Sequence, residues 1–85
     1  MSPDQTMQVK VFAPFKVYYE GPAKSLSGVN DTGPFDILAG HKNFMSLLKP
    51  GELAVTTPDH REIKLPIKRG VMHVKADKIT VFLDV

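Results

Sequence analysis

Apolar and polar residues alternate along most of the chain, which is the pattern of strands with one buried face. In one such segment, Ile63, Leu65 and Ile67 lie opposite charged residues and a proline. In another, Val17 and Tyr19 are predicted to share one face. The segments that alternate with a period of two are residues 8–13, 16–20, 52–57, 62–68 and 78–85. Each of these segments is therefore expected to be a strand.

Turn-forming residues separate the alternating segments. The chain contains 7 prolines and 6 glycines, and the intervals between them are too short for ordinary helices. Hairpin turns are expected at residues 58–60 and 76–78. Pro66 cannot donate a hydrogen bond to a neighbouring strand, so its strand is expected to be an edge or to carry a bulge. The pattern predicts an all-β fold, a sandwich or a barrel, of about eight to ten short, mostly antiparallel strands.

Length and composition limit the classes of protein to consider. With 85 residues the chain fits one domain, expected at residues 8–85 behind a flexible N-terminal tail at 1–7. The absence of cysteine excludes disulfides, thiolate zinc sites and thiol nucleophiles. The polar N-terminus does not resemble a secretory signal. No segment approaches the roughly 18 apolar residues of a membrane span, so direct membrane insertion is not expected.

Charge and motifs exclude two further classes of function. The net charge is +2, and the basic residues are scattered rather than clustered, which does not indicate nucleic-acid binding. The chain contains no phosphate-binding or dinucleotide-binding glycine motif, so no cofactor is expected.

Residues 30–51 depart from plain alternation. This segment is rich in turns and contains short apolar runs at 35–38 and 44–48. Periodicity cannot decide whether 44–48 is a strand or one helical turn. Ordered loops on a sheet often carry function, so this segment is the first place to look for a site.

Candidate chemistry in this segment centres on His41. Its imidazole could contact a partner, or it could form a hydrogen bond with a local carbonyl group. His60 is expected to be solvated in a turn, and His73 to be half-exposed on a strand. The histidines do not have metal-ligand spacing. His41 lies near Asp36 and Ser46 in sequence, but there is no G-x-S-x-G motif to support a hydrolase.

Four aromatic residues fall opposite the main apolar faces of their predicted strands: Phe12, Phe15, Tyr18 and Phe82. One face of each strand in a sandwich should contact water. Apolar side chains on that outer face suggest a surface for a partner. The alternatives are a different strand register or aromatic side chains that cover a sheet edge.

Residues 30–51 also carry a set of residues in a fixed order. Gly33 is followed by an Ile-Leu pair at 37–38, a Gly-His pair at 40–41 and a Lys-Pro-Gly triplet at 49–51. The flanking segments that also match are 9–13, 18–21, 70–74 and 79–83. Together these residues resemble the N-terminal β-sandwich domain of the epsilon subunit of the rotary ATP synthase, over residues 8–85.

The sequence departs from the family pattern at three places. Ala39 stands where the family usually has proline, and Pro34 and Asp36 replace residues that are commonly acidic and glycine. The family's C-terminal helical hairpin inhibits hydrolysis and in some members binds ATP. That hairpin would begin where this sequence ends, so neither role is carried over.

The resemblance implies a mechanical role without bond chemistry. The family's sandwich belongs to the central stalk, contacts the gamma subunit and the membrane-embedded c-ring, and couples proton-driven rotation to ATP synthesis. This implies a non-catalytic, cofactor-free module in the cytoplasm, peripheral to the inner face of the cell membrane. The positions that match the ring-facing end are Asp31, Thr32, Gly33, Pro34, His41 and Lys42. The positions that match the gamma-facing surface are Ala13, Asn43 and Ser46.

Two other hypotheses stay open at this point. The chain could be a stand-alone interaction module that shares the fold but no longer belongs to a synthase, because fold alone does not fix function. It could also be a small enzyme or metal protein that uses His41 and Asp36. Whichever hypothesis holds, exposed sheet edges and an apolar outer face would allow a weak homodimer of the chain when it is isolated from its partners.

Overall fold

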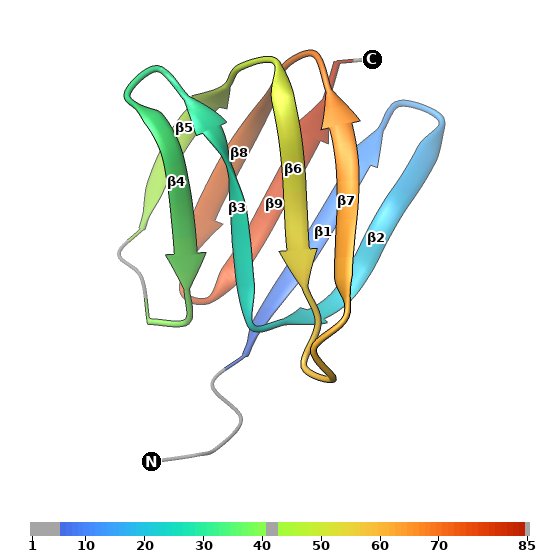
Figure 1. The fold of residues 1–85 in the computed structure, drawn as a ribbon, viewed down its shortest axis with the longest axis vertical. Helices are drawn as coiled ribbons and strands as arrows, with labels where there is room; N and C mark the ends of the chain where they lie inside the picture. The colour runs from blue at the N-terminus through green and yellow to red at the C-terminus, as the bar shows by residue number, and fades with distance from the viewer. Residues whose placement is uncertain (1–5, 41–42, 85) are drawn as a thin grey trace.

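The computed structural model describes residues 6–40 and 43–84, and this part of the chain is built from nine strands without a helix (Figure 1). The strands are β1 (Met7–Ala13), β2 (Lys16–Ala23), β3 (Ser25–Asn30), β4 (Gly33–Leu38), β5 (Phe44–Leu48), β6 (Gly51–Thr56), β7 (Glu62–Ile67), β8 (Gly70–Lys75) and β9 (Lys78–Leu83). The all-β prediction is confirmed. Residues 44–48 form a strand, which settles the alternative that periodicity left open. Within the described residues there is also no helix that could cross a bilayer.

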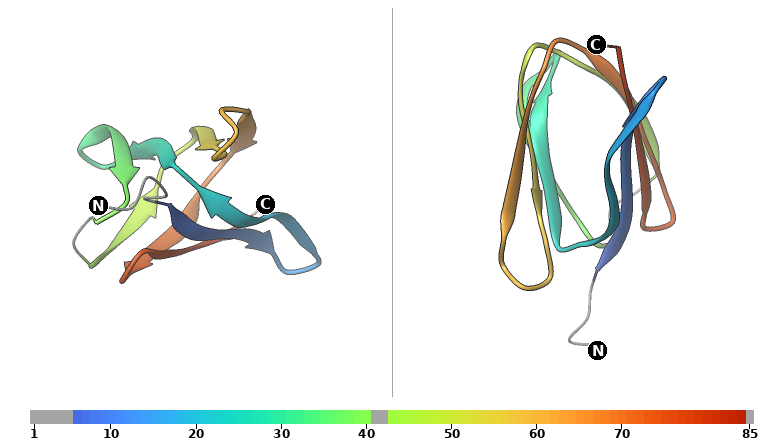
Figure 2. Two further views of the ribbon diagram at one scale, coloured as in Figure 1. Left: turned by 90° about the horizontal axis from the view of Figure 1, so that it is seen from below. Right: turned by 90° about the vertical axis from the view of Figure 1, so that its right-hand side faces the viewer.

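The strands form two layers of one curled sheet. One layer has the order β2-β1-β9-β8-β5, and the other contains β3, β6 and β7 with β4 on the free side of β3. The two layers face each other when the molecule is seen from its side (Figure 2). A short pairing of β5 with β3, at Asn30 and Leu48, joins the layers at one side. The sandwich prediction is confirmed, and all strand pairs are antiparallel except β1 with β9.

The core lies between the layers. Its side chains come from the inward positions of the alternating strands, as the period of two predicts. The buried members of this cluster are Met7, Val9, Val11, Ala13, Ala23, Leu26, Ile37, Leu48, Leu53, Val55, Ile67, Met72, Val74, Ile79, Val81 and Leu83. Aliphatic side chains of this kind supply the main driving force for folding.

The N-terminal boundary of the domain differs from the sequence prediction by one residue. β1 begins at Met7, whose side chain is 1% exposed and packs in the core. Met7 pairs with Ala23 of β2, so it belongs to the sheet and not to a tail. Residues 1–5 of the expected tail lie outside the described residues.

The predicted alternation of β2 is wrong because the strand contains a bulge. Val11 pairs with Tyr19, but Phe12 pairs with Val17, so Tyr18 is an extra residue without a partner on β1. The shift turns Val17 outward, and both tyrosines pack partly against the core. Sequence alternation cannot reveal an inserted residue of this kind.

The edge strands each contain a proline. Pro66 lies on β7, which ends one layer, so the predicted edge position is confirmed. Pro22 lies on β2 at the other end of the strand order, and Pro34 lies on β4, which pairs with β3 alone. Proline cannot donate a hydrogen bond to an added strand, so these edges are poor templates for edge-to-edge association.

A polar network holds the β6–β7 turn, which lies at the predicted hairpin position. The hydroxyl group of Thr57 is buried, accepts a hydrogen bond from the backbone N–H of Arg61 at 3.0 Å, and donates one to the carboxylate of Asp59. Arg61 Nε also lies 3.0 Å from that carboxylate. His60, at the tip of the turn, is exposed and has a positive φ of 67°. These contacts fix the turn without a glycine.

The Thr57 hydrogen bond, with help from the Arg61 charge, holds the pKa of Asp59 below its ordinary value of 3.8. A lowered pKa stabilises the fold above the ordinary value, and this contribution is lost as the pH falls through the lower folded-state pKa. Replacing Thr57 with valine is expected to raise the pKa of Asp59. A carboxyl-carbon NMR titration measures this, with Thr57→Ser as the control that keeps the hydroxyl. An unchanged pKa in the valine variant would contradict the assignment.

Candidate functional site

The outer face of the β2-β1-β9-β8-β5 layer carries a continuous row of apolar side chains. The row crosses all strands of the layer, because each member is the cross-strand partner of the next. From β2 to β5, the members are Val17, Phe12, Phe82, Val71 and Leu47. We call these residues the apolar row. Contiguous apolar side chains on an outer face usually mark a contact surface.

The apolar row is exposed to solvent on the outer face of the layer. Four of its members have between 38% and 61% of their surface exposed, and Phe12 is half-buried. The rings of Phe12 and Phe82 meet edge to face with their centres 5.2 Å apart. Lys10 Nζ lies 5.1 Å from the centre of the Phe12 ring. The two rings and the ammonium group therefore support one another on the outer face.

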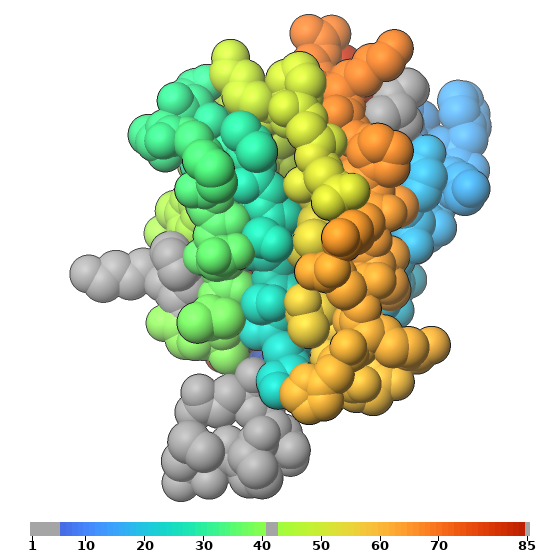
Figure 3. Space-filling model, viewed as in Figure 1, coloured from blue at the N-terminus to red at the C-terminus, as the bar shows by residue number. Residues whose placement is uncertain are grey.

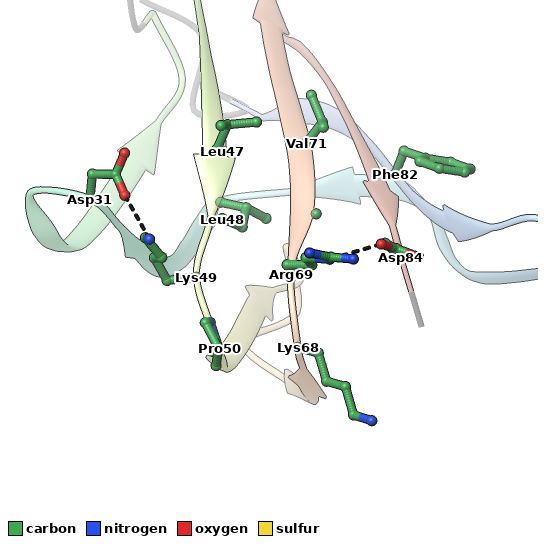
Figure 4. A pocket seen from close by; sticks show the side chains of 11 residues that line it. Asp31, Leu47, Leu48, Lys49, Pro50, Lys68, Arg69, Val71, Phe82 and Asp84 are labelled. Atoms are coloured by element: carbon green, nitrogen blue, oxygen red, sulfur yellow. Dashed lines mark hydrogen bonds and ion pairs between the residues drawn. The ribbon is translucent and has the colours of Figure 1, made fainter.

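A hollow of about 650 Å³ adjoins the β5 end of the apolar row (Figure 4). Three members of the row, from β5, β8 and β9, line it together with turn residues from the same end of the sandwich. Two ion pairs lie at its rim, Lys49 Nζ with Asp31 Oδ1 at 3.2 Å and Arg69 Nε with Asp84 Oδ2 at 2.8 Å. The hollow thus joins an apolar surface to the charged end of the molecule.

The predicted ring-facing turn lies between β3 and β4, at this charged end. The side-chain oxygen of Asn30 accepts hydrogen bonds from the backbone N–H and the hydroxyl of Thr32, at 3.0 and 2.8 Å. Gly33 has a φ of 113°, which side chains rarely allow, and Pro34 fixes the next φ. Asp31 is exposed at the tip. The turn is therefore a braced, polar projection.

Four of the predicted ring-facing residues lie in or directly after this turn: Asp31, Thr32, Gly33 and Pro34. His41 and Lys42 lie outside the described residues, but the residues on either side of them are held at the opposite end. The backbone N–H of Gly40 donates a hydrogen bond to Asp77 of the β8–β9 turn at 2.7 Å. The side-chain oxygen of Asn43 accepts one from the backbone N–H of Ala76 in the same turn, at 2.9 Å. β4 therefore leads the chain away from the β3–β4 turn.

The predicted gamma-facing residues differ in how much surface they offer. Ala13 is 8% exposed and belongs to the core, and Ser46 points inward, where its hydroxyl accepts a hydrogen bond from Asn30 Nδ2 at 3.1 Å. Asn43 is exposed. Next to Ser46, Leu47 points outward with 61% of its surface exposed. The outward side chains of β5 thus offer more contact surface than the predicted ones.

The aromatic residues singled out from the sequence separate into two groups. Phe12 and Phe82 lie on the outer face as predicted and form the centre of the apolar row. Phe15 is fully exposed in the β1–β2 turn, whereas the bulge turns Tyr18 toward the core. Leu47 and the other aliphatic members of the row were missed, because aliphatic residues on both faces of a strand look alike in sequence.

The metal site and the hydrolase considered from the sequence were the chemical alternatives to a contact surface. Among the described residues, no group of three or more histidine and acidic side chains is placed to hold a metal ion. Asp36 lies on β4 and Ser46 on β5, in different layers of the sandwich. His41 lies outside the described residues, so a role for it stays a prediction.

A comparison with known protein families shows which family the chain belongs to. Residues 6–85 match the family described as ATP synthase, Delta/Epsilon chain, beta-sandwich domain. The chain belongs to this family. The family resemblance predicted from the sequence is therefore confirmed.

Curated relatives show the same relationship. The ATP synthase epsilon chain of Psychrobacter sp. is 34% identical over 79 residues, and that of Neisseria meningitidis serogroup B is 35% identical over 80 residues. Each match covers 93% of this chain but 57% of the relative. The chain therefore spans a little more than half the length of these relatives.

Solved structures show the same fold at lower identity. A chain of the Euglena gracilis mitochondrial ATP synthase superposes with a TM-score of 0.87 at 18% identity, covering 98% of this chain and 53% of that chain. A chain of the central stalk and c-ring of the Tetrahymena thermophila mitochondrial ATP synthase gives 0.79 at 16% identity, covering 99% and 67%. At such identities the likeness concerns the fold alone.

Proposed function

We propose that this chain is a non-catalytic module of the central stalk of a rotary ATP synthase. In this role it bridges a gamma-type subunit and the c-ring, turns with the rotor, and helps couple proton-driven rotation to ATP synthesis. It works at the cytoplasmic, inner face of the cell membrane, as a peripheral part of the complex. The observation that carries the proposal is family membership over residues 6–85, since fold likeness alone would not fix a function.

The apolar row supports the contact with a gamma-type subunit. It presents a broad apolar surface on a rigid sheet, and such surfaces supply the central part of stable protein interfaces. Asn43, predicted to face gamma, lies exposed just before β5, which carries one end of the row. Ala13 and Ser46 would support this surface from the inner side of the layer.

The braced β3–β4 turn supports the contact with the ring. Torque passes through a contact only when the contacting groups resist bending, and Asn30, Gly33 and Pro34 hold this turn in one shape. The exposed carboxylate of Asp31 can pair with charges on polar ring loops, which sets orientation more than affinity. His41 and Lys42, which lie outside the described residues, remain proposed contacts.

The stand-alone module, the other hypothesis from the sequence, is not favoured, because the family match and the curated relatives are ATP synthase chains. Such a module would use the same apolar row for a partner outside the synthase. Genes for synthase subunits next to the gene for this chain would favour the first proposal. Their absence, together with a different bound protein, would favour the second.

The test measures binding of the chain to the gamma-type subunit of the same organism. Purified wild-type chain is expected to bind it, and a tagged chain is expected to recover gamma and c subunits from its own cells. Replacing Leu47 with aspartate places a charge in the apolar row and is expected to weaken gamma binding at least about tenfold. Isothermal titration calorimetry gives both affinities.

The chain offers a matched control for this variant. Leu38 lies on β4, in the layer that Figure 3 shows from outside, and is 60% exposed, almost the same as Leu47. Leu38→Asp is expected to bind gamma as the wild-type chain does. Equal losses in both variants would argue against the apolar row as the contact. No binding by the wild-type chain would argue against the proposed function itself.

A further inference from the structure

We propose that the outer face of the β2-β1-β9-β8-β5 layer also recognises carboxylates on its protein partner, beside the apolar contact. The recognising residues are three lysines, Lys10, Lys75 and Lys78, with the imidazole of His73 between them as a further polar group; we call these four residues the cationic patch. This inference rests on the proposed function, because the partner is taken to be the gamma-type subunit. The consequence for the gamma-type subunit is that its contact surface is apolar on one side and acidic on the other.

The strand register places the cationic patch directly next to the apolar row. One step along the strands from the row, Lys10 pairs with Thr80, which pairs with His73. One step further, Lys75 pairs with Lys78. All of these residues are exposed on the outer face. Each step of two residues spans about 6.7 Å, so the patch extends from about 7 to about 13 Å from the row.

The cationic patch is unbalanced in the free chain. Lys75 and Lys78 are directly opposite each other, and like charges in this position are destabilising. In the described part of the chain, neither of them, nor Lys10, forms an ion pair. The nearby carboxylate of Asp77 instead accepts the backbone N–H of Gly40. A partner that brings carboxylates would remove this repulsion.

The surface between these side chains is shaped to receive a side chain. A hollow of about 420 Å³ is lined by His73, Lys75, Ala76, Lys78 and Thr80. The ammonium groups of Lys75 and Lys78 and the hydroxyl group of Thr80 are donors that suit a carboxylate. The nearest acidic residue across the strands is Glu20, which pairs with Lys10. Glu20 lies on the edge strand β2, so it does not face Lys75 and Lys78 on β8 and β9.

The position of the patch favours a protein over an anionic lipid. The cationic patch lies toward the β8–β9 turn, at the end opposite the β3–β4 turn that is proposed to meet the ring. A lipid surface would therefore be at the far end of the molecule. The patch is also continuous with the apolar row, so one partner surface can cover both.

The test compares charge-reversed variants in binding to the purified gamma-type subunit. Lys75→Glu/Lys78→Glu is expected to weaken binding about 30-fold, since it turns attraction into repulsion at a desolvated contact. Wild-type affinity is expected to fall as salt rises, and that of the variant is not. Lys24→Glu/Lys64→Glu makes the same change in net charge at exposed lysines outside the patch, and is expected to change affinity less than about threefold.

The outcomes separate this inference from the proposed function. Wild-type binding with unchanged affinity in Lys75→Glu/Lys78→Glu would overturn the cationic patch and leave the stalk role standing. Failure of the wild-type chain to bind gamma would remove both. Binding of the wild-type chain to phosphatidylglycerol vesicles that is lost in the variant, with gamma affinity unchanged, would assign the patch to lipid and overturn the inference. If the charge-reversed variant does not fold, Lys75→Gln/Lys78→Gln replaces it and is expected to weaken gamma binding about fivefold. Unchanged affinity in this glutamine variant would also overturn the cationic patch.

Discussion

Replacing Leu53 with alanine is expected to lower the free energy of unfolding by about 3 kcal/mol. Leu53 is fully buried on β6, so the change removes buried methyl groups and leaves a cavity that a close-packed core does not fill. A domain of this size has a total stability of roughly 5–10 kcal/mol, so the loss is a large fraction of it. The melting temperature is expected to fall by roughly 12–24 °C, measured by circular dichroism.

The cross-strand partner of Leu53 provides the control. Leu65 pairs with it on β7, an edge strand, and is only partly buried. Leu65→Ala is expected to cost about 1 kcal/mol, since less apolar surface returns to water and solvent can fill the gap. Equal losses in the two variants would show that the centre of the core is not at Leu53.

Replacing Gly70 with alanine is expected to destabilise the domain by about 1–2 kcal/mol, although alanine is intrinsically better than glycine in a strand. A Cβ atom at Gly70 would lie 2.7 Å from the backbone oxygen of Phe82 and 3.0 Å from Leu83 Cδ2. A backbone atom in a strand ladder cannot shift without disturbing the β8–β9 pairing. Chemical denaturation of the purified variant measures the loss.

Gly51→Ala is the matched substitution for this site. A Cβ atom there would meet the side chain of Val29 at 3.3 Å, and no backbone atom lies as close. A side chain can give by a few tenths of an ångström, so this variant is expected to stay within about 0.5 kcal/mol of the wild type. The prediction for Gly70 fails if both variants have the same stability.

The fold could be predicted from the sequence because its local signals agree. Strict alternation in residues 62–68 and 78–85 predicted strands, and the inward positions that the structure describes pack in or against the core; Pro66 marked a real edge. The prediction failed at β2, where the bulge at Tyr18 changes the register. A bulge depends on the pairing of two strands, and one strand's sequence does not contain that information.

The apolar row was less predictable than the fold, for a related reason. Phe12 and Phe82 were noticed because aromatic residues are unusual on an outer face. Their contact, however, depends on the parallel pairing of β1 with β9, and Leu47 joins them only through β8. The row is thus a property of the strand order. The family resemblance supplied the turn at Asp31 but not the row.

The parallel pairing of β1 with β9 also constrains how the chain folds during synthesis. These strands come from opposite ends of the described chain, yet they lie side by side within their layer (Figure 1). Until β9 has left the ribosome, the β1–β2 hairpin has no strand that links it to β8. The β3–β4 and β6–β7 hairpins can form earlier, but the layer with the apolar row is completed last. The apolar row is therefore complete only after β9 has been made, so a chain that ends before β9 cannot present the whole row to a partner.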